Sequence, residues 1–397
     1  MNSTLFERKV GPRELNFAFS PIGFQILIIS LFAIGGALGV LGDHGILFSP
    51  LQVELRWHHI IAALLICAVI MLMVFLSIII KPVQTPLIKT SNGKAGRVIA
   101  SLICMAAGCG LLWFNFRRLS VFELITTNPG AIAFNITEQG GAVLYFSTMS
   151  IFYVGATALL DCVKSRTLSF VIGAIIVGFT LGVILTTRRE LVMIVIAWGG
   201  FLLIHRIGTV KTILIMSPIV VTMLVAALSF RNINLIESPF AYFTSGEFEP
   251  MRYALVLIDR WAKGFEFISP IEYTLPLVSG TKMIGQVNST FASMLFNNGT
   301  ALGVPTVTFF TSFFYLGAIV PLAFYSIHVF IVKQLSWIYR QQQSYLAGFL
   351  YVFSLIKLML FIRNGEMFES LIDSIVIFVF VFTYVIFSGM LLAKGEE

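Results

Sequence analysis

Charged residues are scarce in this sequence: Asp, Glu, Lys and Arg make up 11% of its 397 residues. A soluble globular domain carries about 25% charged residues, so the low charge excludes a soluble enzyme and a disordered chain. Hydrophobic residues reach 58%, and the mean hydropathy is +0.94. These values are typical of a protein whose helices cross a membrane.

Cysteine, histidine and metal-binding motifs are also scarce. The four cysteines lie in or beside apolar runs, which excludes a disulfide framework. Apart from the adjacent His58 and His59, the five histidines are scattered, and no spacing typical of a metal site occurs. We therefore expect no metal ion and no other cofactor. Strict alternation of apolar and polar residues is lacking as well, which argues against a membrane β-barrel.

Long apolar runs are what the sequence does contain. A helix that crosses a membrane needs about 20 predominantly apolar residues. The runs predict an all-α polytopic membrane protein with ten spans in one domain, residues 1–397. The first run follows three basic residues and has no cleavage site, so we expect it to be retained as a span. The expected spans are Pro21–Leu41, His58–Ile80, Val98–Phe114, Ala142–Leu160, Leu168–Thr186, Leu191–Ile204, Thr212–Phe230, Val304–Ile331, Tyr345–Ile362 and Leu371–Leu392.

Basic residues between the spans predict the orientation. With the N-terminus in the cytoplasm, fourteen Lys and Arg residues are cytoplasmic and eleven are external, which the positive-inside rule favours. The even number of spans places the C-terminus in the cytoplasm too, and makes residues 231–303 a large external loop. Nine of the eleven external residues are Arg. Because a guanidinium holds a phosphate or carboxylate with two parallel hydrogen bonds, this bias predicts an anionic external ligand, with surface ion pairing as the plainer interpretation.

The external residues concentrate at three places, of which the first is the triplet Arg188, Arg189 and Glu190 between two spans. The run that follows, Leu191–Ile204, has 14 residues and a length of about 21 Å, against about 30 Å for the hydrocarbon core. Either the bilayer thins here, or the Arg206 side chain reaches outward, or this turn lies below the plane of the lipid headgroups. Paired guanidiniums at headgroup depth match a lipid-linked phosphate. An ordinary turn whose long side chains reach outward is the alternative.

The second place is in the large loop. Residues Glu249–Gly264 have apolar side chains at helical spacing and predict an amphipathic helix on the membrane surface. This helix offers Arg252 and Arg260 to a ligand, and Asn298 lies further along the same loop. A passive external cap is the alternative for the loop.

The third place is the turn after the ninth span, where Arg363 and Glu366 stand close together at a membrane boundary. Six residues earlier, Lys357 is the one charge well inside an apolar run. It either faces the interior of the helix bundle or bends its ammonium outward to the membrane surface.

The arginine-rich turn carries a spacing described for one family. Ten residues separate Arg188 from Gly199, and ten separate Arg189 from Gly200. With ten spans, a large late external loop and a last external Arg, this pattern resembles the Wzy-type polymerases of O-antigen and related oligosaccharide repeat units. In the large loop, the analogous stretch from Arg252 to Gly264 is one residue longer. The resemblance implies a GT-C-like polymerase/ligase architecture in a bacterial inner membrane.

The resemblance also implies the chemistry. Such a glycosyltransferase joins undecaprenyl-diphosphate-linked glycans at the periplasmic face, without a metal ion, because arginines hold the lipid diphosphate. Its implied partners are those glycans, the bilayer and a chain-length-regulating membrane protein, with no nucleic acid. The implied catalytic residues are Arg188, Arg189, Arg363 and Glu366, and Arg252, Arg260 and Asn298 are implied to bind the diphosphate or glycan. The external carboxylates open to the role of general base are Glu190, Glu249, Asp259 and Glu366.

Three other functions stay open at this point. An O-antigen ligase shares the fold and the donor and is expected to use a His in its large loop, whereas residues 231–303 contain none. A lipid-linked oligosaccharide flippase or a small-solute transporter is expected to carry several charges inside its spans, and here only Lys357 qualifies. The third is a membrane assembly factor without enzymatic activity.

Overall fold

A computed structural model describes residues 19–28, 30, 56–83, 94–116, 142–185, 189–229, 258–264, 315, 317, 319–364 and 374–384. Within those ranges the protein is all-helical. The helices are α2 (Trp57–Ile79), α3 (Lys94–Phe116), α6 (Ala142–Cys162), α7 (Arg166–Leu185), α8 (Arg189–Ile207), α9 (Thr209–Ser229), α15 (Ile319–Gln342) and α16 (Tyr345–Asn364). Shorter helical stretches cover residues 21–28, 258–263 and 374–384.

Several of the described helices have the length and composition of membrane helices, as the prediction of a helical membrane protein requires. The number of ten spans stays a prediction. Among the described residues, five helices are long and apolar enough to cross a membrane: Trp57–Ile79, Ala95–Trp113, Arg166–Val183, Ile319–Gln342 and Tyr345–Ile362. Shorter apolar helices cover Ser150–Cys162, Val192–Ile207, Thr209–Ile219 and Ser374–Tyr384.

The short turns between described helices gather at one end of the bundle, here called the turn end. These turns are residues 163–165, 208 and 343–344. The Asp161 carboxylate, at the end of α6, accepts the first backbone N–H groups of α16, 2.6 Å from Tyr345 and 3.0 Å from Leu346. His205 packs against Tyr339 and brings the turn between α8 and α9 to the same place. These three turns belong to segments that the sequence predicts on the cytoplasmic side, and all three lie at the turn end.

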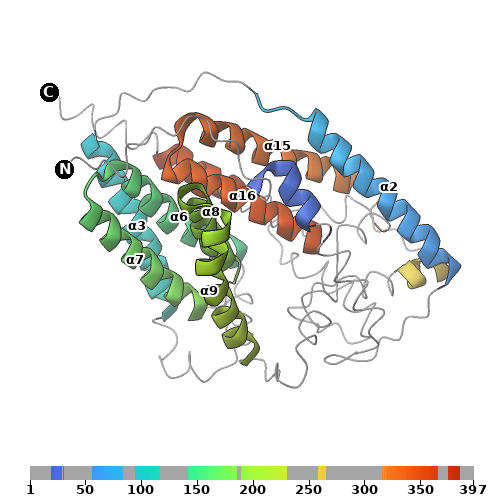
Figure 1. Cartoon of the computed structure of the whole chain (residues 1–397), viewed down its shortest axis with the longest axis horizontal. Coiled ribbons are helices and arrows are strands. Elements are labelled where there is room, and N and C mark those ends of the chain that lie inside the picture. Colours follow the sequence, from blue (N-terminus) through green and yellow to red (C-terminus); the bar gives the residue numbers. More distant parts are fainter. Residues whose placement is uncertain are drawn as a thin grey trace.

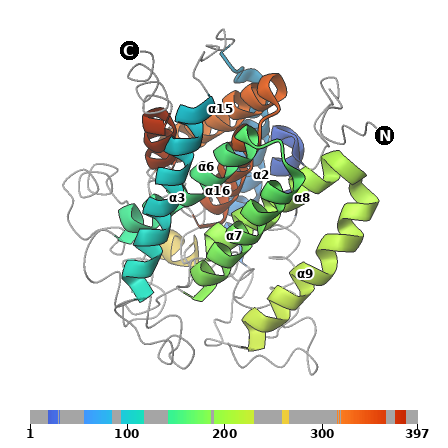
Figure 2. The same cartoon turned by 90° about the vertical axis from the view of Figure 1, so that its left-hand side faces the viewer.

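Helix α16 forms much of the core. Figure 1 shows it beside α15, and Figure 2 shows α9 folding back next to α8 at the edge of the bundle. Helix α16 packs against α15, α8 and α6, and nearly all of its described side chains are buried. Its Lys357 is 4% exposed, with Nζ 5.7 Å from the centre of the Phe353 ring. Of the two positions expected for Lys357, the structure therefore shows the one in the bundle interior.

Helices α3 and α6 touch through glycine. A Cβ atom at Gly108 would lie 2.4 Å from the Cβ atom of Phe152, and one at Gly155 would lie 2.6 Å from the Ser101 carbonyl oxygen. Both separations are too short for a real side chain, so only glycine permits this spacing of the two backbones. Small residues bring helices together in this way in membranes, where packing replaces the hydrophobic effect as the main attraction.

Helix α8 is longer than the sequence predicts. The expected span has 14 residues, whereas α8 has 19 and runs from Arg189 to Ile207. At about 1.5 Å per residue its length is about 28 Å, close to the thickness of the hydrocarbon core. Its apolar part is shorter, since the apolar helix within the described residues covers Val192–Ile207, so the depth of the paired arginines stays a prediction. The charged residues at both ends continue the helix instead of ending it, because Arg and Glu are good helix formers.

Helix α15 is displaced toward the C-terminus from the predicted span Val304–Ile331. It covers Ile319–Gln342 and follows Gly317, whose φ of 78° is a left-handed conformation that favours glycine. The sequence places the end of the span before Lys333, because a charged residue is costly inside a membrane. In the structure the helix continues for nine residues beyond Lys333.

The side chains of Lys333 and Gln334 bind the end of α2, which explains why α15 can continue past them. The Lys333 ammonium donates to carbonyl oxygens in the last turn of α2 and at its end, including that of Ile80 at 2.7 Å. The Gln334 amide accepts the Val83 N–H at 2.9 Å and donates to the Val83 carbonyl at 3.1 Å. A cation at the C-terminus of a helix also stabilises the helix dipole. These contacts fix the end of α2 at the turn end.

We expect the turn end to face the cytoplasm, because the basic residues of the predicted inner segments gather there. In a variant whose four native cysteines are replaced by alanine, Ser245→Cys should react with a membrane-impermeant maleimide in intact spheroplasts. Lys164→Cys, in the 163–165 turn, should react only in inverted vesicles. Labelling of Lys164→Cys in spheroplasts, with Ser245→Cys protected, would reverse the orientation.

Candidate functional site

The structure describes part of the predicted site. Arg189 is the first residue of α8, and Arg363 lies in the last turn of α16. Arg260 is exposed on the helical stretch 258–263, which is the described part of the predicted amphipathic helix. The remaining predicted site residues lie outside the described residues: Arg188, Arg252, Asn298 and Glu366.

Arg189 and Arg363 are carried to the same end of the bundle, here called the loop end, opposite the turn end. Helices α8 and α16 pack against each other in opposite directions, with the Phe201 and Tyr351 rings 5.9 Å apart. Each arginine lies twelve residues along its helix from that ring contact, which corresponds to about 18 Å. Measured along the two helices from this ring contact, the backbone positions of Arg189 and Arg363 therefore lie at about the same distance and on the same side of the bundle.

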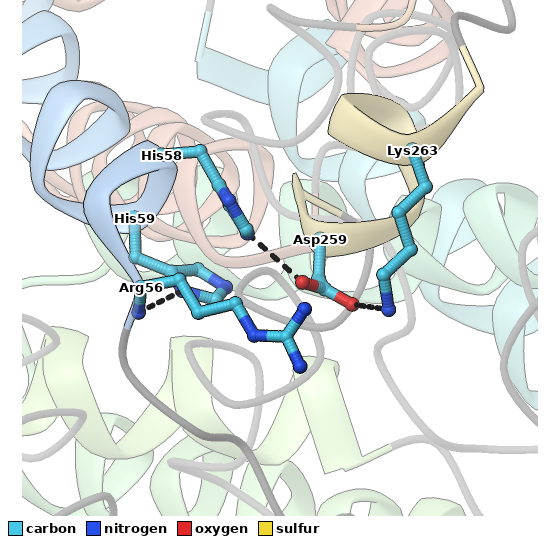
Figure 3. Close-up of polar contacts among 5 residues, drawn as sticks. All are labelled: Arg56, His58, His59, Asp259 and Lys263. Atoms are coloured by element: carbon cyan, nitrogen blue, oxygen red, sulfur yellow. Dashed lines mark hydrogen bonds and ion pairs between the residues drawn. The ribbon is translucent and has the colours of Figure 1, made fainter.

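A polar cluster occupies the start of α2, also at the loop end (Figure 3). The Nε2 atom of His58 lies 2.9 Å from Oδ1 of Asp259, and the Lys263 ammonium binds the other carboxylate oxygen. Asp259 and Lys263 are four residues apart, so they share one face of the stretch 258–263. Figure 1 shows this stretch, in yellow, beside the first turn of α2. The His58–Asp259 contact therefore fastens part of the large loop to a membrane helix.

The sequence around residue 56 explains why α2 begins inside this cluster. Arg56 has an extended backbone, with φ −120° and ψ 167°, so the helix starts at Trp57. His59 is buried, and its Nδ1 accepts the Arg56 backbone N–H at 3.0 Å. This is the role that Glu or Gln usually plays at the third helical position. Since neighbouring helical residues point about 100° apart, His58 is left to face Asp259.

The charges around Asp259 keep its carboxyl group ionised. The Lys263 ammonium, the largest influence, lowers the pKa of Asp259 below its ordinary value. Burial, the second influence in size, acts in the opposite direction, and the hydrogen bond to His58 and the charge of Arg56 add smaller lowering effects. An ionised carboxylate only accepts hydrogen bonds, so His58 donates to it through Nε2–H. In the neutral imidazole, Nδ1 then carries the free lone pair.

The cluster does not fit a metal ion. By number, His58, His59 and Asp259 offer enough donors for zinc, one atom each within 4.8 Å of one another. However, the Nδ1 atom of His59 accepts an N–H, so in the neutral ring its Nε2 holds the proton and has no lone pair for a metal. The Lys263 ammonium also occupies one Asp259 oxygen. The arrangement suits proton transfer between a carboxylate-bound imidazole and a ligand.

No protein-family model, curated protein or solved structure matches this chain. The site therefore stands on its own residues, and one of them, His58, is missed by sequence reasoning. His58 and Asp259 are 201 residues apart, and no spacing rule connects them. The sequence does place both residues on the external side, because His58 begins a predicted span and Asp259 belongs to the large external loop.

Proposed function

We propose that this chain is a multi-pass inner-membrane glycosyltransferase that polymerises undecaprenyl-diphosphate-linked oligosaccharide repeat units at the periplasmic face. The observation that carries the proposal is the contact between His58 and Asp259 at the start of α2. This contact holds the exposed Arg260 and Lys263 of the large loop against a membrane helix. A cationic surface with a proton-transferring pair at a helix end suits a substrate whose diphosphate lies among lipid headgroups.

In the proposed reaction, the growing glycan leaves one lipid diphosphate and joins a hydroxyl group of a single repeat on a second carrier. The bond from the anomeric carbon to the diphosphate oxygen breaks, so negative charge grows on that oxygen. Guanidiniums fixed in place stabilise such charge. We assign this task to Arg189, at the first residue of α8, and to Arg363, in the last turn of α16, and assign Arg260 to the glycan.

The residues outside the described ranges keep their expected roles in this proposal. Arg188 acts with its neighbour in the paired turn, and Arg252 helps to capture the donor. Asn298 binds the glycan, and Glu366 acts beside Arg363. The proposed partners are the lipid-linked glycans, the surrounding bilayer and a membrane protein that regulates chain length.

A ligase is the second candidate, and one observation favours it. The sequence argues against a ligase because the large loop contains no His, yet the structure brings His58 of α2 against the loop residue Asp259. An imidazole at the loop does not require a histidine within the loop. The same donor site would then serve a lipid A-core acceptor in place of a second repeat unit.

Deletion of the gene separates these functions. For a polymerase, the ladder of long surface polysaccharide should disappear while one repeat unit remains attached to its final acceptor. For a ligase or a flippase, no repeat should remain attached. A flippase would in addition leave the lipid-linked repeats on the cytoplasmic side, whereas loss of a polymerase or ligase leaves them on the periplasmic side. Normal surface polysaccharide in the deletion strain would contradict all of these assignments.

A further inference from the structure

We infer that His58 is the general base that takes the proton from the attacking sugar hydroxyl, and that Asp259 is the residue that positions it. This inference rests on the proposed function and deepens it. The sequence leaves the general base open among external carboxylates, of which Asp259 is one. In the structure one oxygen of this carboxylate already binds the His58 imidazole, and the other binds the Lys263 ammonium.

The geometry of the pair supports these roles (Figure 3). Nε2 of His58 donates to Asp259 across 2.9 Å, and the side chains are 29% and 22% exposed, so both are shielded but reachable. A base held by a third group has one tautomer and one orientation. Nδ1 of His58 is then the atom that can accept a substrate proton. Imidazole is also the commonest general base in enzymes.

The charged neighbours of His58 favour the cycle of proton uptake and release. On its own element these neighbours are Arg56 and His59, and on the stretch 258–263 they are Asp259 and Lys263. The Lys263 ammonium lowers the pKa of Asp259 and keeps it ionised at neutral pH. The carboxylate can therefore stabilise the imidazolium that forms when His58 takes the proton.

The inferred step conserves atoms and electrons. The acceptor hydroxyl passes its proton to Nδ1 of His58, while its oxygen lone pair forms the bond to the anomeric carbon of the donor. The bond from that carbon to the lipid diphosphate breaks, and its electron pair leaves with the diphosphate oxygen. His58 returns its proton to water before the next transfer. No oxidant, reductant or further reactant is required.

The test uses the purified full-length protein in lipid vesicles, with lipid-linked repeat units extracted from the gene-deletion strain as substrate. Initial rates of chain extension are measured against pH. We expect His58→Gln to lower kcat by about 100-fold or more with little change in KM, and to remove the decline of the rate at acid pH. Asp259→Asn should keep that decline but move it to lower pH, because the imidazolium loses its carboxylate.

Two further variants separate catalysis from a merely structural contact. His205→Gln, at the turn end, removes an imidazole elsewhere and should leave rate and pH profile unchanged. In His58→Ala, added imidazole should restore part of the rate, which no tether between α2 and the loop would do. The inference is contradicted if His58→Gln keeps the wild-type kcat. It is also contradicted if Asp259→Asn leaves the pH profile unchanged and imidazole does not rescue His58→Ala. Either result leaves the proposed function standing. A wild-type protein that extends no chains overturns the proposed function itself.

Discussion

Arg363→Ala should stop chain extension while the protein stays in the membrane at its normal amount. Arg363 lies in the last turn of α16, the helix at the core of the bundle, so its backbone is held in place. In the proposed reaction its guanidinium binds the leaving diphosphate with two parallel hydrogen bonds. Loss of such a charge-assisted contact costs about 2–3 kcal/mol of transition-state stabilisation, or about 100-fold in rate. Surface polysaccharide gels and chain extension in vesicles measure the effect.

Substitution by lysine tests whether shape or charge matters. Arg363→Lys and Arg189→Lys should restore little activity, because an ammonium is a point charge without the planar fork. Arg340→Ala, at the turn end, removes a guanidinium outside the site and should leave chain length unchanged. Polymer of full length from Arg363→Ala, or full activity in Arg363→Lys, would mean that this residue only anchors its helix at the membrane surface.

The largest structural effect should come from Gly155→Leu. A Cβ atom at this position would stand 2.6 Å from the Ser101 carbonyl oxygen, so α3 and α6 would have to separate. We expect Gly155→Leu to abolish the monodisperse protein peak in mild detergent. Gly155→Ala should cost about 1–3 kcal/mol as an overpacked site, and size-exclusion chromatography after a heating series measures the loss.

Gly110 supplies the matched control for this experiment. It lies on α3, two residues from the close contact at Gly108, and a Cβ atom there would meet nothing within 4 Å. Gly110→Ala and Gly110→Leu should therefore elute and melt as the parent protein does. If Gly155→Leu behaves like the Gly110 variants, the two helices do not pack through glycine.

Helix positions could be predicted where the sequence changes sharply from polar to apolar residues. The span predicted from Tyr345 begins at the observed start of α16, and the one predicted from His58 begins within a residue of α2. The prediction failed for α15, because hydropathy treats Lys333 as a cost whatever it binds. That residue donates to carbonyls at the end of α2, a partner 253 residues away in the sequence. A hydropathy profile contains no such long-range contact.

In the candidate site too, features that the sequence shows directly could be predicted, and contacts that depend on the fold could not. Loop position and residue type indicated Arg189, Arg260 and Arg363, because charge at a membrane boundary is visible in a single sequence. The contact between His58 and Asp259 could not be predicted, since it depends on which carboxylate reaches the imidazole. His59 looks equivalent in the sequence, yet it serves the backbone of Arg56 at the start of the helix. Only the rotation of α2 about its axis distinguishes the two histidines.

The contacts that fix α2 at both ends set an order for biosynthesis. Its partners Asp259 and Lys333 lie 201 and 253 residues after the atoms that they bind. At about 5–20 residues per second, a ribosome needs about 10–50 s to make that stretch of chain. During this delay lipid must accommodate α2, and its side chains allow this, since Leu64 and Met71 are each 67% exposed even in the finished protein. Helices α3 and α6 can pair during the same interval, so part of the bundle forms before α2 acquires its contact with α15.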